Sequence, residues 1–168
     1  MTDAFIIEVL SSSHDRLAFT SGSEVLDRYL QSQASQDVRR RISNCFVAVP
    51  PASTIIAGYY TLAASSIPLT DLPEELANRL PRYPVIPAAI IGRLAVDRQY
   101  RRRGLGAALL FDAVQRTMRA DPAVFTLIVD AKDDDAVAFY RRFGFLPFAS
   151  RAMSLYLPIA TAAKLFES

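Results

Sequence analysis

The sequence contains few of the residues that build covalent or metal-bound frameworks. Its 168 residues include one cysteine, Cys45, one histidine, His14, and no tryptophan. A single cysteine excludes an intrachain disulfide, and one cysteine with one histidine cannot build a Cys/His zinc site. Cys45 is therefore expected as a small core residue of a strand, and His14, in a polar stretch, as a solvated side chain. This usage fits the reducing conditions of the cytoplasm.

Long hydrophobic runs and a basic leader are also missing. Polar residues or prolines interrupt the apolar runs well short of the roughly 20 residues of a membrane-spanning helix, and Asp3 and Glu8 lie within the first ten residues. We therefore expect a cytoplasmic protein with no signal peptide and no membrane contact. Half of the residues are hydrophobic (51%) and 21% are charged, which with the length predicts one folded domain over 1–168.

Lysine is scarce, and arginine carries most of the positive charge. The net charge is +2, but it is unevenly distributed. The segment 39–103 has ten basic and four acidic residues, a net charge of +6, whereas the rest of the chain has nine basic and thirteen acidic residues, a net charge of −4. Because the guanidinium fork matches phosphate oxygens, this asymmetry favours a polyanionic partner. An arginine-rich genome would give the same composition, and a solvated basic face is the plain alternative. The candidate contacts to RNA phosphates are Arg39, Arg40, Arg79 and Arg82.

Hydrophobic periodicity predicts a mixed α/β fold with helices flanking a sheet. Apolar residues at helical spacing, with caps, indicate helices over 21–41, 107–119 and 133–145. The second of these places Ala107, Leu110, Phe111, Val114 and Met118 on its core side. Strands are expected over 44–49, 53–67, 88–97, 123–131 and 151–158. A proline-rich connecting segment over 69–87 is expected to contain at most one helical turn, at 74–79.

The stretch "RRRGLG", 101–106, joins a predicted strand to a predicted helix. In this geometry the backbone N–H groups at a helix start converge on an anion, and glycines let a ligand approach closely. A P-loop is excluded because Ala107 and Ala108 follow the second glycine. A dinucleotide fingerprint fits poorly because Leu109 replaces a small residue. The remaining pattern, R/Q-x-x-G-x-G/A, is met by Arg101, Gly104 and Gly106, although a basic surface turn would look the same in isolation.

This pattern is typical of the pyrophosphate loop of the GNAT acetyltransferases. The blocks "IGRLAVD", "RRRGLG" and "VDAKDDDAVAFYRRFGF", together with "FTSGSEVLDRYL", resemble one branch of that family, the toxins of type II toxin–antitoxin pairs that acetylate charged tRNA. The similarity extends from about Phe19 to Pro158. It implies the GNAT fold and acetyl-CoA as co-substrate. No metal is expected, because the acidic run 133–135 is typical of a helix cap. The residues that it assigns to acetyl-CoA are Leu94, Ala95, Val96, Arg101, Arg102, Arg103, Gly104, Leu105, Gly106 and Ala107.

The same resemblance makes Tyr140 the candidate catalytic residue. A free α-amine has a pKa of about 7.7–8.0, so the acceptor needs no strong protein base, whereas the departing CoA thiolate benefits from a proton donor. From periodicity alone, Tyr140 belongs to a core stripe with Ala136, Phe139 and Phe143. The packing role and the catalytic role are compatible, because the ring can pack in the core while the hydroxyl faces the thioester. Arg93, in a buried strand, is expected to face the acceptor cleft or an internal carboxylate. Asp133 and its two acidic neighbours are expected to cap a helix.

The resemblance implies transfer of an acetyl group from acetyl-CoA to the α-amine of an aminoacyl-tRNA, which blocks translation. It also implies a homodimer and a cognate ribbon-helix-helix antitoxin. Two alternatives remain open at this point. One is an acetyltransferase for another amine, such as a protein N-terminus, a lysine or a small molecule. The other is a non-catalytic acyl-CoA or RNA binding module on the same fold.

Overall fold

The computed structural model describes residues 4–166, which form a mixed α/β fold. The strands are β1 (Ile6–Val9), β2 (Asn44–Val49), β3 (Gly58–Pro68), β4 (Val85–Val96), β5 (Thr126–Asp130), β6 (Leu146–Pro147) and β7 (Ser154–Pro158). The α-helices are α1 (Glu24–Arg28), α2 (Ala34–Arg39), α3 (Glu74–Ala77), α4 (Leu105–Arg119), α5 (Asp134–Arg142) and α6 (Ile159–Phe166). A π-helical turn, Tyr29–Gln33, joins α1 to α2. Short 3₁₀ turns occupy Leu69–Asp71 and Arg98–Tyr100.

The strands follow the order β1-β2-β3-β4-β5-β7-β6 in a seven-stranded mixed sheet. The chain divides into two compact units, and the boundaries between them fall within β3, β4 and α4. Unit 1 comprises the chain up to Ala63 together with Gly92–Ala113, and unit 2 comprises Ala64–Ile91 and the chain from Val114. The mixed α/β class expected from the sequence is therefore confirmed.

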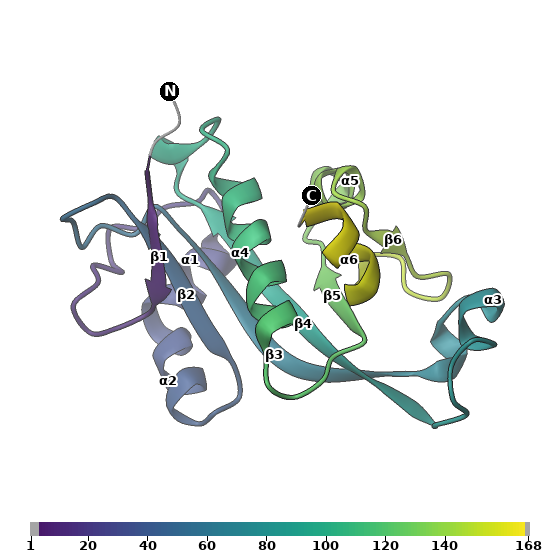
Figure 1. The fold of residues 1–168 in the computed structure, drawn as a ribbon. Coiled ribbons are helices and arrows are strands. Elements are labelled where there is room, and N and C mark those ends of the chain that lie inside the picture. Colours follow the sequence, from purple (N-terminus) through teal and green to yellow (C-terminus); the bar gives the residue numbers. More distant parts are fainter. Residues whose placement is uncertain (1–3, 167–168) are drawn as a thin grey trace. The chain divides into compact units, whose positions relative to one another are not determined.

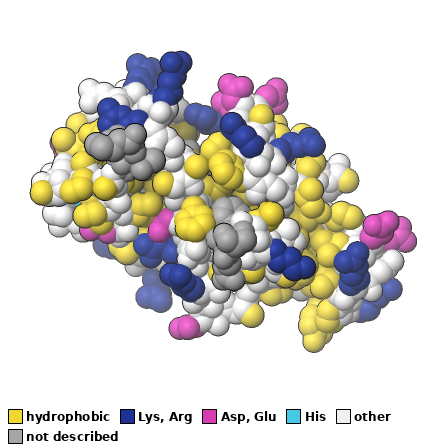
Figure 2. Space-filling view, turned by 45° about the horizontal axis from the view of Figure 1, so that its top comes forward, with side chains coloured by type: hydrophobic (Ala, Val, Ile, Leu, Met, Phe, Trp, Pro, Cys, Tyr) yellow, Lys and Arg dark blue, Asp and Glu magenta, His cyan; other side chains and the backbone are white. Residues whose placement is uncertain are grey.

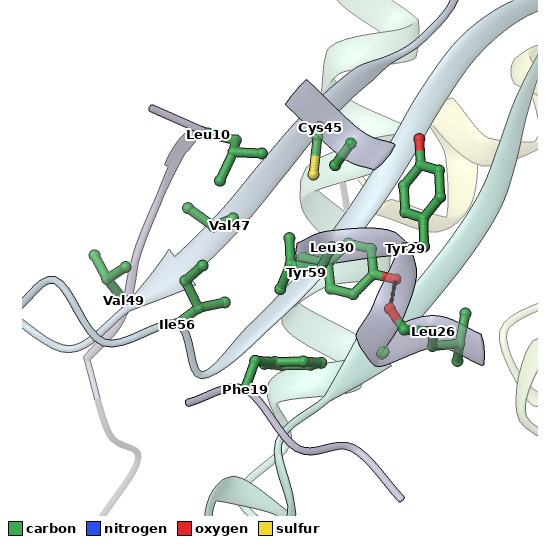
Figure 3. Close-up of a cluster of buried hydrophobic side chains, with 12 residues drawn as sticks. Leu10, Phe19, Leu26, Tyr29, Leu30, Cys45, Val47, Val49, Ile56 and Tyr59 are labelled. Atoms are coloured by element: carbon green, nitrogen blue, oxygen red, sulfur yellow. Dashed lines mark hydrogen bonds between the residues drawn. The ribbon is translucent and has the colours of Figure 1, made fainter. Parts of the chain in front are cut away.

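Unit 1 is built on an antiparallel sheet in which β1 pairs with β2 and β2 with β3 (Figure 1). Its core lies where the inward residues of these strands meet α1 and the π-helical turn (Figure 3). Leu30 and Tyr59 are fully buried there, and the Tyr59 hydroxyl donates to the Leu26 carbonyl at 2.7 Å. This hydrogen bond satisfies a polar group in an apolar environment and ties the helix to the sheet.

Unit 2 contains the parallel pair β4 and β5 and the antiparallel pairs β5–β7 and β7–β6. Ile67, Ile128, Phe148 and Tyr156 are among its buried core residues. Helix α5 begins after Asp133, whose side chain accepts the N–H of Ala136 at 2.8 Å. The acidic run is thus a helix cap, as expected from the sequence.

Several expectations about individual elements are wrong. Phe111 is 42% exposed, whereas Leu110 and Val114 of the predicted core side of α4 are fully buried. Leu105, Leu109 and Ala113, which were not predicted, are at most 2% exposed and belong to the same buried side. His14 is buried rather than solvated: its Nδ1 accepts the N–H of Ser11 at 3.0 Å and its Nε2 donates to Glu8 at 2.8 Å.

Strand β1 and helix α6 were not expected from the sequence, and β3 begins five residues later than predicted. Among residues 4–166, no helix is long and apolar enough to cross a membrane.

Candidate functional site

The start of helix α4 in unit 1 offers unpaired backbone donors. The N–H of Ala108 donates to the Gly104 carbonyl at 3.0 Å, so Gly104 is the N-cap residue, and it has no side chain that could cap the helix. The three N–H groups that follow Gly104, those of Leu105, Gly106 and Ala107, have no intrahelical acceptor. They lie at the positive end of the 15-residue helix. Gly104 adopts φ +74°, and a Cβ built there would meet no atom within 4 Å. The turn is therefore open to an anion, and its backbone conformation favours glycine.

The three arginines before this glycine have different environments. The Arg101 guanidinium donates to the Ser21 carbonyl, so it is held against the N-terminal segment. Arg102 is exposed and adopts φ +64°. Arg103 lies 5.2 Å from the ring centroid of Tyr100, a cation–π contact. All three place positive charge beside the helix start, but they do not form one cluster of free guanidinium groups.

The C-terminal end of β4 leads directly into this loop. Ala95 is buried, whereas Leu94 and Val96 are half-buried. The strand lies close to its neighbours: a Cβ at Gly58 would come within 3.0 Å of both the Ala95 carbonyl oxygen and Leu109 Cδ1. Glycine at position 58 is therefore what lets this end of β4 and helix α4 pack so closely.

Arg93 precedes this segment and lines a cavity of about 520 Å³ next to the π-helical turn. Its guanidinium carbon lies 3.6 Å from the ring centroid of Tyr29, and no carboxylate of the described chain forms an ion pair with it. Tyr29 in turn donates to Asp37 at 2.7 Å. Arg93 therefore lines a cavity, and the internal ion pair is not found among the described residues. That this cavity takes the acceptor stays a prediction.

The environment of Tyr29 keeps its hydroxyl protonated. Burial and the hydrogen bond to Asp37 raise the pKa of Tyr29, while the Arg93 charge acts in the opposite direction. The same hydrogen bond lowers the pKa of Asp37. Sequence reasoning missed Tyr29 and Asp37 because a π-helical turn, which sets how these residues face Arg93, has no reliable sequence pattern.

Tyr140 lies on α5 in unit 2 and is 5% exposed. Its ring packs edge-on against Phe139 and in a tilted contact against Phe145, with centroids 5.2 and 5.6 Å apart. Burial first, and then the nearby charge of Asp130, raise the pKa of Tyr140, so its phenol stays protonated. Within the described residues this hydroxyl makes no hydrogen bond, unlike those of Tyr29 and Tyr59. Its O–H group is therefore a hydrogen-bond donor with no acceptor among residues 4–166.

The arginines expected to contact RNA are exposed. In the part of the chain that the structure describes, Arg39 and Arg40 in unit 1 and Arg79 and Arg82 in unit 2 form no ion pair. Figure 2 shows Lys and Arg side chains (dark blue) at several separate places on the face that it draws, with hydrophobic and uncharged surface between them. On this face the basic charge is distributed and does not form one continuous patch.

Comparison with known proteins places these features in a family. Residues 84–153 match the model of the acetyltransferase (GNAT) domain. A tRNA-acetylating toxin of Mycobacterium tuberculosis is 35% identical over 138 residues, which are 81% of this chain and 81% of that toxin.

Two solved structures extend the similarity. The toxin AtaT complexed with acetyl-methionyl-tRNAfMet has a TM-score of 0.89 and 28% identity over 97% of this chain and 99% of that one. A mutant AtaT bound to the C-terminus of the antitoxin AtaR and to acetyl-CoA has a TM-score of 0.83 and 26% identity, covering 99% of this chain and 100% of that one.

The chain therefore belongs to the GNAT acetyltransferases, and it is an acetyl-CoA-dependent N-acetyltransferase. Within the family its relatives are toxins that act on tRNA.

Proposed function

We propose that this protein is a toxin that transfers the acetyl group of acetyl-CoA to the α-amine of an aminoacyl-tRNA and thereby blocks translation. The similarity to tRNA-acetylating toxins along most of the chain carries the proposal. An N-acetylated aminoacyl group has no nucleophilic amine, so it cannot accept the growing peptide.

The loop 101–107 binds the pyrophosphate of acetyl-CoA. The supporting feature is the helix start at Gly104, where the N–H groups of Leu105, Gly106 and Ala107 lack side-chain capping. Arg101, Arg102 and Arg103 contribute positive charge around this site. In this arrangement Leu94, Ala95 and Val96 present the backbone with which the pantetheine arm pairs.

Tyr140 is the catalytic proton donor. Acetyl-CoA supplies the acetyl thioester, the neutral amine forms the new N–C bond, and the C–S bond breaks. Tyr140 gives its proton to the departing sulfur and recovers one from solvent, while the proton lost by the amine passes to water. Because its pKa is raised, the phenol of Tyr140 is protonated at neutral pH and is not a base. Its hydroxyl, which has no partner among the described residues, supports the donor role.

Arg93 forms one wall of the acceptor pocket. The pyrophosphate site lies beyond the C-terminal end of β4, so the reactive end of the pantetheine arm is directed toward the N-terminal side of Leu94. Arg93 is the next residue in that direction, and it lines the cavity beside Tyr29. Its guanidinium, free of carboxylates, can donate to the carbonyl oxygen of the aminoacyl ester.

Arg39, Arg40, Arg79 and Arg82 bind tRNA phosphates. Their exposure and lack of ion pairs support this role. We further propose that residues 1–168 work as one catalytic domain, that the protein is a cytoplasmic homodimer, and that a cognate antitoxin of the ribbon-helix-helix type inhibits it.

The test uses the purified protein, acetyl-CoA and a pool of charged tRNAs. After hydrolysis of the ester bond, mass spectrometry should detect an N-acetyl amino acid, and its identity names the substrate. Uncharged tRNA and the free amino acids serve as controls, and neither should yield product. Bound acetyl-CoA with no product from charged tRNA would contradict the proposal and direct the search to protein and small-molecule amines.

A further inference from the structure

One acidic side chain at the end of β4 contacts two separate segments of unit 1. Asp97 is 8% exposed; its Oδ2 accepts the N–H of Thr20 and its Oδ1 accepts the N–H of Gln99, both at 2.9 Å. Within residues 4–166 it forms no ion pair. The charge of Asp97 is therefore compensated by backbone N–H donors. One carboxylate oxygen binds the N-terminal segment at Thr20, and the other binds the segment that follows β4 at Gln99.

The same N-terminal segment is held at two further points. The N–H of Arg98 donates to the Thr20 carbonyl at 2.9 Å, and the Arg101 guanidinium donates to the Ser21 carbonyl. Residues 20 and 21 are thus bonded to both ends of the segment 97–101, which leads into the proposed pyrophosphate loop.

The contacts continue from this segment to helix α1. Both the N–H and the hydroxyl of Ser21 donate to Asp27 Oδ1, at 2.9 and 2.6 Å. Gly22 follows with φ +97°, and a Cβ there would lie 2.9 Å from Arg101 Nη2 and 3.2 Å from Arg98 Nε. The positive φ favours glycine at this position, and the two guanidinium groups come close to the backbone there.

Helix α1 and the following π-helical turn supply Tyr29 and its neighbours, which line the cavity with Arg93. Hydrogen bonds and adjacent residues of the backbone therefore link the segment that leads into the proposed acetyl-CoA loop to helix α1. The contacts run from Gln99 through Asp97 to Thr20, and from the adjacent Ser21 to Asp27.

We propose that Asp97 is a positioning residue that couples the acetyl-CoA loop to the acceptor pocket. Acetyl-CoA orders the loop, and Asp97 and Arg101 then fix residues 20–21 and, through Asp27, the start of α1. The proposal rests on the acetyl-CoA site of the proposed function, but it does not depend on which amine is the acceptor.

The test measures hydrogen exchange of the full chain, alone and with saturating acetyl-CoA, in the parent protein, in Asp97→Asn and in Asp15→Asn. The asparagine keeps the size of Asp97 but replaces one accepting oxygen with a donor that faces an N–H group. Asp15 is an exposed carboxylate of the same unit and is the matched control. Calorimetry measures acetyl-CoA binding to each form in parallel.

In the parent and in Asp15→Asn, acetyl-CoA should slow exchange of a peptide covering 17–28 roughly tenfold or more. In Asp97→Asn this slowing should fall below about threefold although acetyl-CoA still binds, because a charge-assisted hydrogen bond corresponds to a tenfold or larger change in an equilibrium constant. Equal slowing in Asp97→Asn, no slowing in the parent, or complete loss of acetyl-CoA binding in Asp97→Asn would overturn the proposal.

A milder variant keeps the test decisive if Asp97→Asn fails to fold. Ser21→Ala removes the 2.6 Å hydrogen bond to Asp27 and leaves both backbone contacts of Thr20 in place. Acetyl-CoA should still slow exchange around Thr20 but should no longer slow it in α1. Protection of α1 equal to that of the parent would contradict the coupling. Neither measurement uses tRNA, so a failure to acetylate charged tRNA leaves this result interpretable.

Discussion

Replacing Gly104 with alanine separates the cost to folding from the cost to acetyl-CoA binding. The φ of +74° is unfavourable for alanine by roughly 1–2 kcal/mol. No atom lies within 4 Å of the new methyl group, so no steric clash adds to this cost. For a chain of this size, 1 kcal/mol corresponds to a change in Tm of about 2–4 °C. We therefore expect Gly104→Ala to fold with a Tm lowered by about 2–8 °C.

Acetyl-CoA binding should respond much more strongly, because the proposal places the pyrophosphate against the N–H groups that follow Gly104, and the methyl group takes up part of the open space at this residue. We expect the Kd for acetyl-CoA to rise at least tenfold, about 1.4 kcal/mol, measured by calorimetry. Gly144→Ala is the control: it also has positive φ, and its Cβ would lie 2.9 Å from Leu165 Cδ1 in unit 2. It should lower Tm at least as much without changing Kd. An unchanged Kd in folded Gly104→Ala would refute the assignment of the loop.

Three further predictions concern the core, the thiol and the basic surface. Leu30→Ala, at a fully buried position, should lower the free energy of unfolding in urea by about 2–5 kcal/mol, whereas Val25→Ala, at a 78% exposed position, should change it by less than about 0.5 kcal/mol. Burial raises the pKa of the Cys45 thiol from 9.0 to about 12. Above pH 9 the thiol therefore ionises in the unfolded chain but not in the folded protein. The free energy of unfolding should fall by about 1.4 kcal/mol between pH 7 and pH 10, relative to Cys45→Ala. An equal pH dependence of the two proteins would contradict this. Arg79→Ala and Arg82→Ala should each weaken tRNA binding and reduce the slope of log affinity against log salt by about one; unchanged slopes would remove these residues from the RNA contact.

The elements that hold the proposed site were predictable from the sequence because their signals are local. β2 has the predicted bounds, and Asp133 caps α5 as its position before an apolar helix indicated. Gly104 was recognisable from its context, a glycine-containing turn between a predicted strand and a predicted helix, together with the GNAT resemblance. The GNAT resemblance, confirmed by the comparisons, assigned a role to Tyr140 that helical periodicity alone would have given to core packing.

The parts that were missed depend on contacts between distant segments. His14 looked solvated in its polar stretch, and only the fold brings Glu8 within 2.8 Å of it. On α4 the burial of Leu110 was predicted correctly, but Phe111 was expected to be buried and Leu109 was not, because both are apolar and packing alone decides which is buried. The stacking of Arg93 on Tyr29 joins residues 64 positions apart across a π-helical turn, and no spacing in the sequence indicates it.

The central claim combines a substrate with a proton donor, and one measurement tests both. It is the single-turnover rate of acetylation of charged tRNA, with acetyl-CoA saturating, for the parent, Tyr140→Phe and Tyr156→Phe. Tyr156 is the matched control, because it is a second buried tyrosine of unit 2 whose hydroxyl has no hydrogen bond among the described residues. The account predicts a loss of about 100-fold or more in Tyr140→Phe and a rate near that of the parent in Tyr156→Phe. A Tyr140→Phe rate within threefold of the parent would contradict it.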